Sequence, residues 1–177
     1  MKRKEEFLPD GIRRLAIASD IISTWRAATT VIPAQFALGT AQHEASFTVN
    51  EKDTEPSGYI SMGIFQLGQE EIDHVKVPGA DVYTLAGSVA LYVPLALERL
   101  HKLLVISFLD ATCPPADIWF YLAMAHNMGL GAALKSIKEH GLNAAAWTAR
   151  NPQLAQAAVY FNDCITGGKH WTPELNA

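Results

Sequence analysis

Glu44 is the residue whose setting most directly indicates chemistry. It continues, at helical spacing, a stripe of small and apolar residues formed by Ala34, Ala37, Leu38 and Ala41. We therefore expect its carboxyl group to point along the buried face of a helix. Apolar surroundings disfavour the charged carboxylate, and a general acid working near neutral pH needs that property. Helical spacing alone, however, is more typical of an ordinary acid at a helix end that turns to solvent.

Two further blocks of residues follow Glu44 in an informative order. They are Ser61-Met62-Gly63-Ile64-Phe65-Gln66-Leu67 and Tyr121-Leu122-Ala123-Met124-Ala125-His126-Asn127-Met128-Gly129-Leu130-Gly131. With Gln42-His43-Glu44-Ala45-Ser46-Phe47, they resemble the lysozyme-like superfamily, and most closely the soluble lytic transglycosylases and goose-type lysozymes. That family has a Glu at a helix end with an aromatic three residues on, a Gly-Leu-Met-Gln-Ile type strand, and an Ala-Tyr-Asn-Ala-Gly-x-Gly stretch. The resemblance spans about residues 33–160.

The resemblance implies an enzyme that cleaves the glycan strands of bacterial peptidoglycan. Glu44 would be the catalytic acid and base at the β-1,4 bond between N-acetylmuramic acid and N-acetylglucosamine, leaving a 1,6-anhydro end. Animal lysozymes carry a second carboxylate two residues before the Gly of the strand motif, and this chain has Ser61 there. A lytic transglycosylase with one Glu is therefore favoured over a hydrolase that needs two carboxylates. Asp53 and Glu55 keep hydrolysis open, although a solvated turn is their more common role.

The expected substrate-binding residues surround Glu44. Gln66 would bind an N-acetyl group or hold Glu44 in place, and Asn127 would contact substrate or cap the following turn. His126 stands where the family usually has Tyr, and the family's two serines are each displaced by one residue. The resemblance also offers a late active-site tyrosine. The full set is Ser46, Tyr59, Ser61, Gln66, His126, Asn127 and Tyr160.

The elements that must position these residues are mainly helical. Residues 48–58 are rich in loop and turn formers, and residues 59–67 are expected to be extended, as a small hairpin. We expect a mainly α (α+β) protein with the lysozyme-like fold, in which a helical domain carries a small β-hairpin beside the active-site cleft. Helices are expected at residues 12–28, 33–44, 81–109 (two helices, broken or kinked near Pro94), 117–138 (whole or interrupted at 129–131), 143–149 and 152–164.

Length and composition bound the class of protein. The chain has 177 residues, of which 49% are hydrophobic and 18% charged, so it is expected to fold as one domain over residues 1–177 with a core at about 9–165. Its net charge of −4 argues against a nucleic-acid partner. No uninterrupted apolar run approaches the ~20 residues of a membrane span, and charges interrupt any apolar core of a signal peptide.

We therefore expect a soluble protein without a signal peptide, and a monomer. The resemblance implies that its partner is the peptidoglycan glycan strand. The histidines lack metal-ligand spacing, so neither a metal nor a cofactor is expected. A site of action in the periplasm or cell wall, as a bacteriophage lysis enzyme or virion component, fits these features, and a bacterial enzyme exported by another route stays open. The rival hypotheses are a muramidase acting on the same bond and a catalytically silent lysozyme-like structural or glycan-binding module.

Overall fold

A computed structural model describes residues 10–107 and 116–142. Within those ranges the protein has six helices and one three-stranded antiparallel sheet. The expected mainly helical α+β class is confirmed. The helices expected at 143–149 and 152–164, and with them Tyr160, lie outside the described residues.

The first two helices agree with the sequence prediction. Helix α1 spans Asp10–Ala28 and α2 spans Ala34–Ala45, with Pro33 at the N-cap of α2. The indole Nε1 of Trp25 donates a 2.8 Å hydrogen bond to the backbone oxygen of Ile32, which ties α1 to the short connection before α2. Both residues are buried, so α2 is held at a fixed angle against the core.

The sheet follows α2 and is larger than the expected hairpin. Strands β1 (Lys52–Thr54), β2 (Ile60–Met62) and β3 (Leu67–Gly68) pair in sequence order. Strand β1 lies in the segment predicted as loop and turn, and that part of the prediction was wrong. All three residues of β1 are exposed, so no alternation of apolar and polar residues marked the strand.

Two corrections concern the next helices. Helix α3 (Gln69–Val75) was not predicted, because it has no buried residue and hence no apolar stripe. Helix α4 (Leu85–Ile106) is a single helix that contains Pro94, where two helices were expected. Proline inside a helix costs ~3 kcal/mol, and burial of residues on both sides of Pro94 offsets this cost. The helix begins after Thr84, whose side chain accepts a hydrogen bond from the Gly87 backbone.

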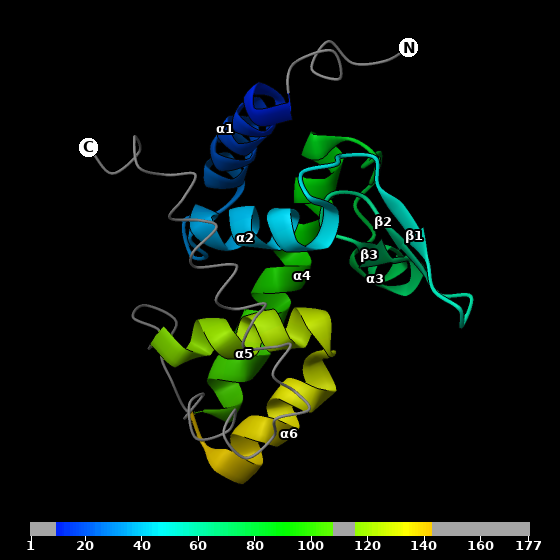
Figure 1. The fold of residues 1–177 in the computed structure, drawn as a ribbon. Helices are drawn as coiled ribbons and strands as arrows, with labels where there is room; N and C mark the ends of the chain where they lie inside the picture. The colour runs from blue at the N-terminus through cyan, green and yellow to red at the C-terminus, as the bar shows by residue number, and fades with distance from the viewer. Residues whose placement is uncertain (1–9, 108–115, 143–177) are drawn as a thin grey trace.

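Helices α5 (Ala116–Asn127) and α6 (Leu130–His140) complete the described fold. The chain breaks between them at Gly129, whose φ of 86° lies in the left-handed region. The interrupted form of the predicted helix 117–138 is thereby confirmed. Figure 1 shows α4 running behind α2 and α5, with the sheet and α3 on one side of α2.

The core gathers around α4, which contacts α1, α3, α5 and α6. At its centre the rings of Trp25, Phe65 and Tyr92 pack together, with the Phe65 and Tyr92 centroids 4.6 Å apart. Aromatic clusters of this kind bury much apolar area and hold their neighbours rigidly. The cluster therefore joins the sheet-side loop that carries Phe65 to the helical core. Among the described helices, none is long and apolar enough to cross a membrane.

Candidate active site

Glu44 lies in the last turn of α2. Ala37 and Ala41, on the same stripe, are fully buried, whereas the Glu44 side chain keeps 19% of its surface exposed. The helix ends directly beyond it, because Ser46 adopts the left-handed conformation with φ 47° and its backbone N–H bonds back to the helix. Phe47 follows with φ 62° and is completely buried, which anchors the turn. Glu44 is thus a partly buried carboxyl group at a fixed helix end.

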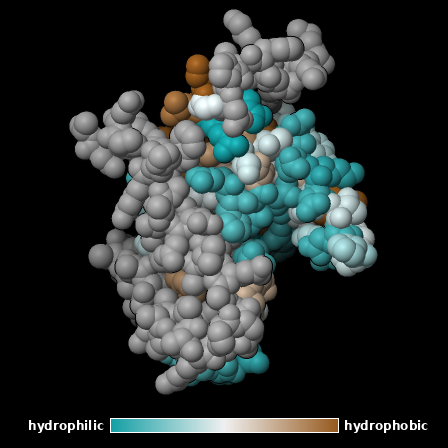
Figure 2. All heavy atoms as spheres, in the orientation of Figure 1, coloured by the Kyte–Doolittle hydropathy of each residue, from teal (hydrophilic) through white to brown (hydrophobic). Residues whose placement is uncertain are grey.

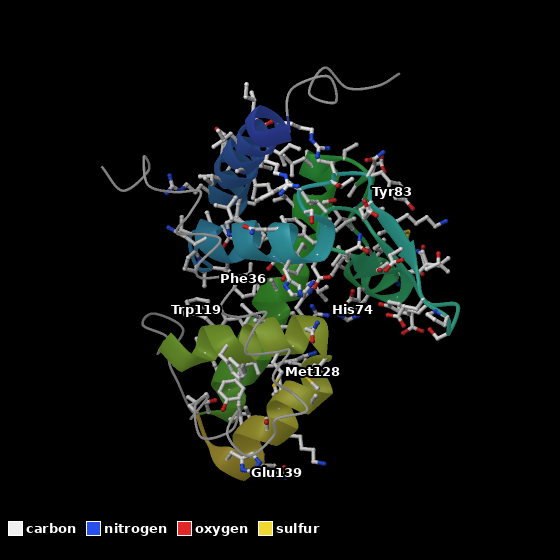
Figure 3. The ribbon with its side chains drawn as sticks, in the orientation of Figure 1. Phe36, His74, Tyr83, Trp119, Met128 and Glu139 are labelled. Atoms are coloured by element: carbon white, nitrogen blue, oxygen red, sulfur yellow. The ribbon has the colours of Figure 1, made fainter. Side chains whose placement is uncertain are left out.

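A cavity of about 190 Å³ opens on one side of Glu44. It lies between the end of α2, the sheet, α3 and the end of α5. Figure 3 labels Met128, which directly follows the end of α5. Six of the eight predicted site residues line this cavity. Its lining is Glu44, Glu55, Tyr59, Ser61, Gln66, Glu71, His126 and Asn127.

Glu44 also lines a second cavity, of about 250 Å³. Glu44 and Gln66 line both cavities, so they stand at the boundary between them. The other lining residues come from the last residue of α2, the segment that follows it and β1; they are Ala45, Ser46, Thr48, Glu51 and Asp53. Figure 2 shows hydrophilic residues gathered on this face, over the end of α2 and the sheet. A carboxyl group between two polar cavities can reach a bond whose two halves occupy them.

Gln66 is held by its own turn. Its Nε2 donates to the Gly63 backbone oxygen at 2.8 Å, and its Oε1 accepts a 2.8 Å hydrogen bond from the Ser61 hydroxyl. The backbone of Gln66 is left-handed, with φ 50°, a conformation that costs of order 1–3 kcal/mol for a residue other than glycine. The protein therefore keeps the amide at the boundary of the two cavities at an energetic cost. In this structure the Ser61 hydroxyl is thus a hydrogen-bond donor to the Gln66 side chain.

A buried arginine contacts two residues that line the first cavity, Glu71 and His126. Arg99 on α4 is 7% exposed, and its guanidinium pairs with the Glu71 carboxylate while its Nη1 lies 3.2 Å from Nδ1 of His126. The Glu71 carboxylate also accepts a 3.0 Å hydrogen bond from the Gly68 backbone. These contacts connect α3, α4 and α5 around one guanidinium.

His126 is held in its neutral form. Burial, and secondarily the positive charge of Arg99, lower the pKa of the His126 imidazole from 6.5 to about 3. Its side chain is only 4% exposed, and its Nε2 lies 3.6 Å from Oε1 of Glu44. The ring also packs on Tyr92, with 4.9 Å between centroids. His126 is therefore an uncharged polar neighbour of Glu44.

Tyr59 forms an exposed wall of the first cavity. The residue is 44% exposed, and its hydroxyl lies against Gly68, where an added Cβ would stand 1.9 Å from the oxygen. Burial of the hydroxyl, and then the Glu71 carboxylate, raise the pKa of Tyr59 above its usual value of 10.0. The hydroxyl stays protonated and is able to donate a hydrogen bond.

The structure brings most of the predicted site together. Ser46 reaches only the second cavity, together with Asp53, while Glu55 reaches the first. Met62 and Phe65, within the second sequence motif, are core residues. Tyr160 lies outside the described ranges.

Sequence reasoning missed Glu71 and Arg99. Arg99 did carry a signal, because it falls at helical spacing on a stripe of otherwise uncharged residues that are all buried, namely Tyr92, Ala96 and Leu103. A charged residue on such a stripe is rarely buried without a partner. Glu71 carried no comparable signal, since α3 has no buried face.

The described residues contain no group of three or more His, Cys, Asp or Glu side chains arranged to hold a metal ion. A scan against protein-family models and searches of curated proteins and of solved structures each found no match to the chain. The site therefore has to be interpreted from its own geometry.

Proposed function

We propose that the protein is a peptidoglycan lytic transglycosylase with Glu44 as its single catalytic acid and base. The observation that carries the proposal is the position of Glu44 between two polar cavities. Cleavage of a glycan strand requires a proton donor beside the bond, with room for a sugar on either side. Hydroxyl, amide and carboxylate groups line both cavities, and such groups bind sugar hydroxyls and N-acetyl groups.

The proposed fold is lysozyme-like. In support, Glu44 lies in the last turn of a helix, a small antiparallel sheet follows, and Asn127 at the end of α5 lines the same cavity. This is the order in which the three sequence motifs occur. We place the activity at the cell wall, in a phage lysis enzyme or a virion component.

In the proposed reaction, Glu44 first protonates the glycosidic oxygen between N-acetylmuramic acid and N-acetylglucosamine. The resulting carboxylate then accepts the proton of the muramic 6-hydroxyl, whose oxygen closes the 1,6-anhydro ring. One carboxyl group thus gives a proton and recovers one, and no water is consumed. Gln66 and Asn127 would bind the N-acetyl and hydroxyl groups on the two sides.

The products of digestion test this proposal. Purified peptidoglycan sacculi are digested, the released muropeptides are treated with borohydride, and their masses are measured. The proposal predicts fragments lighter by one water than hydrolysis products and without a reducible end. Absence of any release from sacculi, with binding retained, would instead support a silent glycan-binding module.

One observation favours muramidase activity as the second candidate. Asp53 lines the second cavity with Glu44, so a second carboxylate is present on that side. An inverting hydrolase needs such a group as the base that activates water. The muramidase hypothesis predicts reducible ends and loss of activity in Asp53→Asn. A transglycosylase predicts anhydro ends from both the wild-type protein and the variant.

A further inference from the structure

Arg99 determines which nitrogen of His126 carries the proton. A guanidinium has only donors, and its Nη1 faces Nδ1 of His126 at 3.2 Å. Nδ1 must therefore accept this hydrogen bond and carry no proton. A neutral imidazole then has its single N–H on Nε2. The ion pair with Glu71 holds the guanidinium in this orientation.

Nε2 of His126, which carries this N–H, lies 3.6 Å from Oε1 of Glu44, a separation longer than a hydrogen bond. The ring is also hydrogen bonded to the backbone of Phe65. The donation from Arg99 polarises the ring and makes this N–H a stronger donor.

We propose that His126 is a positioning residue that determines which oxygen of Glu44 carries the catalytic proton. The positive end of an N–H dipole close to Oε1 repels a hydroxyl hydrogen on that atom and attracts its lone pairs. The transferable proton therefore resides on Oε2. The catalytic consequence rests on the proposed function, whereas the tautomer of His126 does not.

The surroundings of His126 keep this arrangement through the working pH range. Glu44 and His43 approach from α2, and Arg99 and Tyr92 from α4. A protonated ring would place an Nδ1–H against the Arg99 guanidinium, so the cation is excluded at neutral pH. The carboxylate of Glu44 is the group that favours the cation, and it lies farther from the ring than Arg99 does.

Nitrogen NMR of the histidine-labelled protein tests the tautomer without any assay of activity. Long-range proton–nitrogen spectra should show His126 as the neutral Nε2–H form, with no titration between neutral pH and about 4. Arg99→Gln, if folded, should release the ring, and His126 should then titrate nearer to the ordinary histidine range. An Nδ1–H tautomer, or ordinary titration of His126 in the wild-type protein, would overturn the proposal.

Kinetics test the positioning role. His126→Leu should lower kcat roughly tenfold with KM nearly unchanged, since the N–H that favours a proton on Oε2 is lost. His126→Gln retains an N–H near the Nε2 position and should recover much of this loss. His101→Leu, at an exposed position on α4, is the matched control. Equal kcat in His126→Leu and wild type would overturn the positioning role, whereas an active Glu44→Gln variant would overturn the proposed function and leave the tautomer result intact.

Discussion

The guanidinium of Arg99 on α4 pairs with the carboxylate of Glu71 on α3, and Glu71 lines the same cavity as Glu44. Their side chains are 9% and 23% exposed. The pair connects the sheet-side elements to the helical core, because Glu71 also accepts the N–H of Gly68 at the end of β3. One ion pair therefore supports the wall of the site and the orientation of His126.

Removal of the Arg99 charge should destabilise the fold. Arg99→Gln leaves a mostly buried Glu71 carboxylate without its partner, and we expect the free energy of unfolding to fall by about 3 kcal/mol. Lys102→Gln on the same helix breaks the exposed pair with Glu98 and should cost less than about 1 kcal/mol. Urea unfolding of both variants measures the difference. Equal losses would contradict a structural role for the buried pair.

His126 should make stability depend on pH on the acid side. Burial and Arg99 lower its pKa from 6.5 to about 3 in the folded protein. Between these two values the unfolded chain binds a proton that the folded chain does not. The free energy of unfolding is therefore unaffected by this group above about pH 6.5 and decreases as the pH falls from there towards 3. The free energy of unfolding should decrease by up to about 1.4 kcal/mol per pH unit in that window.

Comparison with His126→Gln isolates this contribution. All other titrating groups are shared, so the difference between the two slopes of unfolding free energy against pH reports on His126. The variant should show the shallower slope between about pH 6.5 and 4. Parallel slopes would contradict the lowered pKa.

Gly63 should be intolerant of a side chain. It has a φ of 74°, and an added Cβ would lie 2.3 Å from the Val82 backbone oxygen. Gly63→Ala should therefore cost about 3 kcal/mol, since backbone must move. Gly58 has a φ of 86° with nothing within 4 Å, so Gly58→Ala should cost only ~1–2 kcal/mol of backbone strain. Thermal unfolding compares them, and equal costs would argue against tight packing at Gly63.

Features that depend on local spacing were predictable from the sequence. The helical period alone predicts the stripe of residues that ends at Glu44. The tolerance of glycine for positive φ alone predicts the break at Gly129. Both agree with the structure. Strand β1 could not be found in this way, because pairing with β2 and not burial forms it.

The charged support of the site depends on contacts between distant elements. Arg99 meets Glu71 and His126 only after α3, α4 and α5 have packed, so no sequence window contains the three residues. The preference of Tyr59 for the cavity wall likewise depends on Gly68 in β3 leaving room for its hydroxyl. The resemblance suggested candidate residues, among them His126. It did not indicate the buried Arg99 that contacts His126.

The most direct test of the central claim is the activity of Glu44→Gln on purified peptidoglycan. The substitution keeps the size of the side chain and removes its ability to give and accept the proton. Glu70→Gln, exposed on α3 and outside both cavities, is the matched control, and urea unfolding confirms that both variants are folded. We predict that Glu44→Gln releases no muropeptides while Glu70→Gln clears the suspension at the wild-type rate. Clearing by folded Glu44→Gln at the wild-type rate would contradict the account.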